Sequence, residues 1–107
     1  MENREIASLF HALSDENRVC VLKMLQAGER CACELLRELD VSQPTLSHHM
    51  KILCESGLVN DRREGKWTYY SISADGAKAT MQVLKELTTL RKGRRRKPCC
   101  ADASPTK

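Results

Sequence analysis

Two cysteines separated by a single residue, Cys31 and Cys33, are the side chains of this 107-residue chain whose type and spacing point most directly to chemistry. Thiolates are soft ligands, which bind thiophilic metal ions in preference to Mg²⁺ or Ca²⁺. Residues i and i+2 of a regular helix point about 200° apart, so both sulfurs reach one centre only in an extended or unwound turn. We therefore expect the pair at the entrance to a helix, where a bound ligand would hold that turn in a particular shape.

The four other cysteines are separate from this pair. Cys20 and Cys54 each lie among apolar helical residues and are expected to pack in the core as small hydrophobic side chains. The adjacent Cys99 and Cys100 are either ligands or incidental thiols of a tail. Six cysteines would indicate disulfides in a secreted chain, but the residues after Met1 form no secretion leader and no apolar run is long enough to span a membrane. We therefore expect a cytoplasmic protein with free thiols and no membrane contact.

Apolar residues recur mostly at helical spacing, which predicts a mainly α-helical fold. The expected helices cover residues 2–13, 15–27, 35–39, 43–56 and 73–90. Within the second helix, Val19, Leu22 and Leu25 are expected to face inward. Residues 67–72 are rich in strand formers and follow a basic turn, so residues 58–72 are predicted to form a small β-hairpin.

Basic charge gathers at the C-terminal end of the chain. Residues 1–90 contain 11 lysines and arginines against 13 acidic residues, whereas residues 91–107 contain 7 against 1. We therefore divide the chain into one domain, residues 1–90, and a flexible basic tail, residues 91–107, which carries Cys99 and Cys100. A domain of this size buries only a modest core, and the last helix has a wider apolar stripe than such a core needs, so we expect a homodimer.

The two helices expected over residues 35–39 and 43–56 are joined by a short turn, which is the helix-turn-helix pattern. With the basic hairpin after it, this pattern predicts a winged helix, a fold that binds double-stranded DNA through its second helix and its hairpin. Polar side chains at the start of the second helix are expected to read base edges: Gln43, Thr45, Ser47 and His48. Basic side chains are expected to contact phosphate: Lys51, Arg62, Arg63 and Lys66. His49, beside the apolar stripe, either packs or makes a contact.

A thiol enzyme is the alternative class that the sequence disfavours. Such an enzyme needs a thiolate with a positioned base, or a cradle for an oxyanion. The sequence contains neither a glycine-rich loop nor a cysteine paired with a histidine. We therefore expect no enzymatic activity and no catalytic cofactor.

Three segments of the helix-turn-helix and hairpin region have distinctive sequences: VSQPTLSHHMKIL (41–53), ESGLV (55–59) and RREGKWTYY (62–70). They closely resemble the ArsR/SmtB family of metal-responsive repressors, and the likeness extends over about residues 5–90. The resemblance implies a dimer that pairs through its first and last helices, occupies operator DNA without metal, and releases the DNA when metal binds.

The resemblance also gives Cys31 and Cys33 a role, because arsenic-responsive members of the family carry a Cys-x-Cys box at the start of this helix, usually completed by a third nearby thiol. The chain departs from the pattern at Leu36, where the arsenic type often has that third cysteine. Cys99 and Cys100 are the substitutes that we expect, from the same or the other subunit. Other members bind zinc through histidines and carboxylates of the last helix, but the last helix of this chain has no histidine.

We therefore expect a transcriptional repressor whose effector is arsenite, or else trivalent antimony, bound by Cys31, Cys33, Cys99 and Cys100. Trivalent arsenic takes three thiolates, whereas a zinc or cadmium site usually takes four ligands. Two alternatives on the same fold are a thiol redox sensor and a repressor that senses cadmium, lead or zinc.

Overall fold

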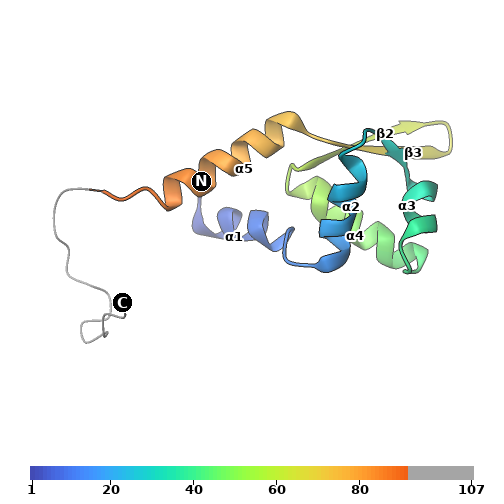
Figure 1. The fold of residues 1–107 in the computed structure, drawn as a ribbon, viewed down its shortest axis with the longest axis horizontal. Coiled ribbons are helices and arrows are strands. Elements are labelled where there is room, and N and C mark those ends of the chain that lie inside the picture. The colour runs from blue at the N-terminus through green and yellow to red at the C-terminus, as the bar shows by residue number, and fades with distance from the viewer. Residues whose placement is uncertain (92–107) are drawn as a thin grey trace.

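The computed structural model describes residues 1–91, which form five helices and a three-stranded antiparallel sheet (Figure 1). In chain order the elements are α1 (Asn3–His11), α2 (Glu16–Leu25), β1 (Arg30–Cys31), α3 (Ala32–Glu38), α4 (Gln43–Glu55), β2 (Val59–Glu64), β3 (Trp67–Ile72) and α5 (Ala74–Leu87). The predicted mainly α-helical fold with a small β-hairpin is confirmed, although each helix ends slightly earlier than predicted. The predicted tail lies outside the described residues, apart from Arg91.

Side-chain caps explain where α2 and α4 begin. The Asp15 carboxylate accepts hydrogen bonds from the backbone N–H groups of Asn17, at 2.8 Å, and Arg18, at 3.4 Å. The Ser42 hydroxyl accepts a hydrogen bond of 3.3 Å from the backbone N–H of Thr45. Each cap satisfies backbone donors that have no partner within the helix, and so fixes the residue at which the helix starts.

The core lies between α2, α3, α4 and the start of β2. Its buried side chains are Ala12, Val21, Leu25, Leu35, Leu39, Leu46, Met50, Leu53, Leu58 and Val59. Because α4 contributes three of these residues at helical spacing, its buried face is fixed against the rest of the domain and its opposite face is left to solvent.

The inward face of α2 differs from the predicted one. Arg18, Val21 and Leu25 are buried, at spacings of three and four residues, whereas Val19 remains 37% exposed. Since this stripe passes through Arg18, the helix turns Cys20 to the solvent, and the prediction that Cys20 packs in the core is wrong. Cys54 is half-buried against the core, as predicted.

The sheet has a strand that the sequence pattern did not reveal. β2 and β3 form the predicted hairpin, in register from Val59 opposite Ile72 to Glu64 opposite Trp67, with Gly65 at a positive φ of 63° in its two-residue turn. The two-residue strand β1 then adds to the other edge of β3, giving the order β1-β3-β2.

Helices α1 and α5 extend to the same side of the molecule, away from the sheet and the core (Figure 1). α5 begins against the turn that follows α4, where a Cβ atom on Gly76 would lie 1.8 Å from the carbonyl oxygen of Gly57. The two backbones therefore touch directly at this point. Within residues 1–91, no helix is both long and apolar enough to cross a membrane.

Candidate nucleic-acid interface and thiol site

The exposed face of α4 carries the polar side chains that the sequence predicted to read bases. Gln43, Thr45, Ser47 and His48 are all exposed, as is Lys51 one turn further on. Leu46, Met50 and Leu53 anchor the opposite face in the core. Of the exposed set, Thr45 is held by Ser42, whose hydroxyl donates a 3.0 Å hydrogen bond to the Thr45 hydroxyl. The helix thus presents hydrogen-bonding groups on a firmly packed support.

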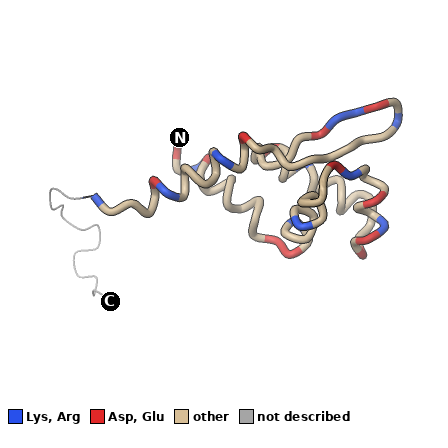
Figure 2. Tube along the Cα trace, turned by 45° about the horizontal axis from the view of Figure 1, so that its top comes forward, with Lys and Arg blue, Asp and Glu red and all other residues tan. Residues whose placement is uncertain are grey.

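The hairpin of β2 and β3, which we call the wing, carries its charged residues on β2 and in the turn, as Asp61, Arg62, Arg63, Glu64 and Lys66, and none on β3 (Figure 2). Arg62 donates two hydrogen bonds to the Glu29 carboxylate, at 2.8 and 3.1 Å, and a third to Glu64 at 2.6 Å. Its guanidinium also lies 4.6 Å from the centre of the Tyr69 ring. The hydrogen bonds from Arg62 lower the pKa of Glu29, and those to Glu29 and Glu64 raise the pKa of Arg62. A phosphate would therefore compete with two carboxylates for this arginine.

Arg63 and Lys66 are exposed on the wing. The Lys66 ammonium lies 5.9 Å from the centre of the neighbouring Trp67 ring. Both side chains are accessible to a phosphate in the described structure, and their contact with DNA remains a prediction.

The structure brings the two sulfurs of the Cys-x-Cys pair together. Cys31 ends β1 and caps α3 in an extended conformation, with φ −79° and ψ 151°, and Cys33 lies in the first turn of α3. Their Cα atoms are 5.3 Å apart and their sulfurs are joined as a disulfide. The Cys31 backbone N–H donates a 3.0 Å hydrogen bond to Glu34, which completes the cap. This is the extended helix entrance that both sulfurs need to reach one centre.

A pocket of about 240 Å³ lies beside this pair and opens between α4 and the wing. Cys31 and Cys33 line it together with Gln43 from α4 and Trp67 from the wing. Leu36, the position at which the family resemblance implied a third thiol, lines the same pocket. A ligand held by the two sulfurs would therefore lie next to both DNA-facing elements.

A third ligand for this pocket is not found within residues 1–91. No group of three or more histidine, cysteine, aspartate or glutamate side chains is arranged to hold a metal ion in that part of the chain. Cys99 and Cys100 lie outside the described residues.

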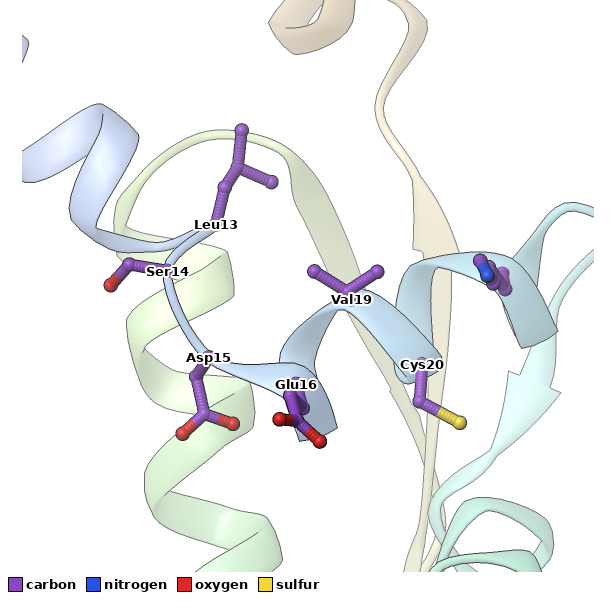
Figure 3. Close-up of a pocket in the computed structure, with 7 residues that line it drawn as sticks. Leu13, Ser14, Asp15, Glu16, Val19 and Cys20 are labelled. Carbon is purple, nitrogen blue, oxygen red and sulfur yellow. The ribbon is translucent and has the colours of Figure 1, made fainter.

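A larger open hollow of about 580 Å³ lies at the junction of α1 and α2 (Figure 3). Leu13, Val19 and Cys20 contribute to its lining, with Asp15 and Glu16 along its rim. It contains one thiol, which cannot chelate an ion by itself. None of the residues that the sequence predicted for a site lies in it.

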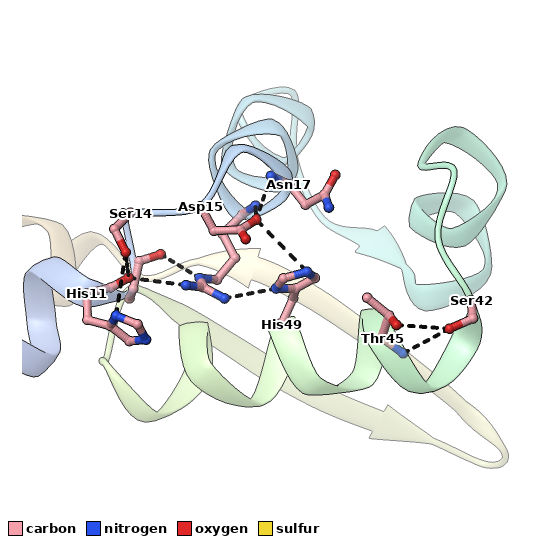
Figure 4. A network of polar contacts seen from close by, with 9 residues as sticks. His11, Ser14, Asp15, Asn17, Ser42, Thr45 and His49 are labelled. Carbon is pink, nitrogen blue, oxygen red and sulfur yellow. Dashed lines mark hydrogen bonds and ion pairs between the residues drawn. The ribbon is translucent and has the colours of Figure 1, made fainter.

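Sequence analysis did not identify two buried polar residues, Arg18 and His49, as a pair. Arg18 is only 4% exposed and its guanidinium bonds to His49, which is 7% exposed (Figure 4). His49 therefore packs, which settles the choice that the sequence left open. The signal for Arg18 was its place three residues before Val21, on a stripe that is otherwise apolar.

Comparison with known proteins identifies the family to which this fold belongs. The sequence profile of bacterial regulatory proteins of the arsR family matches residues 15–61. An arsenical resistance operon repressor of Staphylococcus aureus is 42% identical over 68% of this chain and 70% of the repressor. The chain belongs to the ArsR family. Members of this family are DNA-binding transcriptional regulators, which is not an enzyme class.

Two other relatives and one solved structure agree with this assignment. An uncharacterized HTH-type transcriptional regulator of Methanocaldococcus jannaschii is 40% identical over 76% of this chain and 92% of that protein. A cadmium resistance transcriptional regulatory protein CadC homolog of Staphylococcus aureus is 35% identical over 73% of this chain and 65% of its own length. The crystal structure of the ArsR family transcriptional regulator RHA00566 superposes with a TM-score of 0.73 at 25% identity, covering 81% of this chain and 90% of that one. The predicted winged helix-turn-helix is confirmed.

Proposed function

We propose that this ArsR-family repressor binds operator DNA as a homodimer and releases it when trivalent arsenic, or antimony, binds its cysteine thiolates. The observation that carries the proposal is the position of Cys31 and Cys33, whose shared pocket is also lined by Gln43 of α4 and Lys66 of the wing. The relatives named arsenical resistance operon repressors support arsenic as the effector.

The DNA-binding part of the proposal rests on the exposed face of α4. In a winged helix this face enters the major groove, where Gln43 can make a two-point contact with adenine and the neighbouring polar side chains can reach base edges. Lys51, Arg63 and Lys66 would add contacts with phosphate, which strengthen binding without reading sequence.

The homodimer is supported by the apolar face of α5. Met81, Leu84 and Leu87 of α5 are 66, 49 and 56% exposed, and Leu90, just beyond the end of the helix, is 94% exposed. Burying side chains of this size is worth about 1.5–3 kcal/mol each, so a second copy of the same helix is a favourable partner. α1 extends beside α5 on the same side of the molecule and would complete the interface (Figure 1).

The release step follows from how the thiol pair is attached. Cys31 lies opposite Tyr69 in the β1–β3 pairing, so its backbone is part of the wing's sheet, whereas Cys33 belongs to α3. In the reduced protein, the cysteine thiols would replace the hydroxyl groups of arsenous acid: each As–S bond forms as an As–O bond breaks, the S–H proton leaves with the hydroxyl as water, and arsenic remains trivalent. Cys99 or Cys100 would supply the third thiolate. Spreading the two sulfurs around arsenic would change the angle between β1 and α3, and with it the placement of wing and α4.

The first test is a titration of DNA-bound protein with arsenite under reducing conditions, using a duplex selected by the wild-type protein from random DNA and fluorescence anisotropy as the readout. Cys31→Ser and Cys33→Ser are expected to bind the duplex normally and to lose release by arsenite. Cys20→Ser, which alters an exposed thiol elsewhere, is the matched control and should release like the wild type. Normal release by both test variants would contradict the proposal.

X-ray absorption then counts the sulfurs around arsenic. The full chain is expected to show three sulfur ligands and a chain truncated after Lys97 only two. Three sulfurs in the truncated chain would contradict a role for the tail.

A thiol redox sensor is the second candidate, because the structure joins Cys31 and Cys33 as a disulfide. Such a sensor would ignore arsenite when kept anaerobic and reduced, and would release DNA on addition of peroxide. Cadmium, lead and zinc belong in the same titration, since one relative is named as a cadmium resistance regulator.

A further inference from the structure

Arg18 joins three helices through a single buried guanidinium. Its Nε donates a 2.9 Å hydrogen bond to the carbonyl of Ala12, and its Nη2 donates a 3.2 Å bond to the carbonyl of His11, both at the end of α1. Its Nη1 lies 2.9 Å from Nδ1 of His49 on α4 (Figure 4). Within residues 1–91, no buried side-chain nitrogen or oxygen lacks a hydrogen-bond partner.

The chemistry of this contact defines the protonation of His49. A guanidinium only donates hydrogen bonds, so Nδ1 of His49 must accept and cannot carry a proton. The imidazole in this arrangement is therefore neutral, with its proton on Nε2. That nitrogen faces the Asp15 carboxylate at 3.9 Å, which is too long for a hydrogen bond.

The position of the contact gives it a consequence for DNA binding. His49 follows His48, which lies on the exposed face of α4, and the two rings are 6.1 Å apart. The Arg18 bond thus acts on α4 directly behind the residues that would face bases. We propose that Arg18 and His49 are positioning residues, whose hydrogen bond sets the placement of α4 relative to α1 and α2 and thereby the affinity for DNA. This inference rests on the proposed operator binding, and it does not depend on the effector.

The test compares the wild-type chain with His49→Gln and His49→Leu, and binding to the selected duplex is measured by anisotropy at constant pH and ionic strength. Glutamine can still accept a hydrogen bond from Arg18, so this variant should keep the wild-type affinity within about twofold. Leucine removes the acceptor and should weaken binding about tenfold.

Two results would overturn the inference: a folded glutamine variant that binds DNA as weakly as the leucine variant, or a folded leucine variant with unchanged affinity. If circular dichroism shows the leucine variant unfolded, the affinity of the glutamine variant decides, since a loss of about tenfold there would contradict the inference. Failure of the wild-type protein to select any duplex would instead contradict the proposed function.

Discussion

The two elements that face DNA, α4 and the wing, are held in place by different forces. α4 is fixed from behind by buried apolar side chains and by the Arg18–His49 contact, while its outer face is exposed to solvent. The wing extends away from the core (Figure 2), and its Arg62 is held on the surface by two carboxylates. Burial is insensitive to salt, whereas exposed ion pairs are weak and screened. The position of α4 should therefore depend on packing, and that of the wing on solution conditions.

The largest expected effect comes from the buried side of α4. Leu53 is fully buried, so Leu53→Ala removes apolar contacts and leaves a cavity. We expect the free energy of unfolding to fall by about 3 kcal/mol, measured by urea denaturation. A loss below about 1 kcal/mol would mean that packing does not anchor this helix as described.

A smaller effect is expected at the start of α4. Ser42→Ala removes the hydroxyl that caps the Thr45 N–H and should lower the free energy of unfolding by about 1 kcal/mol. Ser8→Ala, at an exposed position inside α1, is the control and should change stability by only a few tenths of a kcal/mol. Equal effects of the two substitutions would show that the cap has no special role.

The smallest effect is expected on the wing, and it concerns DNA rather than folding. Glu29→Gln removes the carboxylate that binds Arg62 through two hydrogen bonds, so a phosphate can compete for this arginine more easily. The slope of log affinity against log salt should become steeper by about one unit. Glu38→Gln is the control, because it removes an equal charge from a carboxylate paired at 3.8 Å with Arg30. The same slope in both variants would show that Arg62 does not reach phosphate.

The sequence could predict those features that neighbouring residues determine, but not those that depend on distant residues. The helices, the caps Asp15 and Ser42 and the hairpin follow from local patterns, in which a few neighbouring residues determine the structure. The strand β1 could not be found this way, because it has two residues and exists only through pairing with residues about forty positions later.

For the site, the sequence could predict the residues but not all of their partners. The meeting of Cys31 and Cys33 follows from their spacing and from the helix that begins between them. The Arg18–His49 bond and the Glu29–Arg62 pair each join residues more than thirty positions apart, which no local pattern reveals. The position of Cys20 was predicted wrongly for a related reason. An apolar pattern alone places the cysteine on the buried face of α2, but the buried face passes through an arginine, Arg18, and leaves Cys20 exposed.

The direct backbone contact between Gly57 and Gly76 has a geometric consequence for the proposed dimer. It places the first turn of α5 against the chain that leaves α4, with no room for a side chain on Gly76. Operators for symmetric dimers place their half-sites about 34–36 Å apart, one turn of the double helix. If α5 joins the subunits, then the distance between the two reading helices is set through this contact, and two glycines help determine which operator spacing fits the protein.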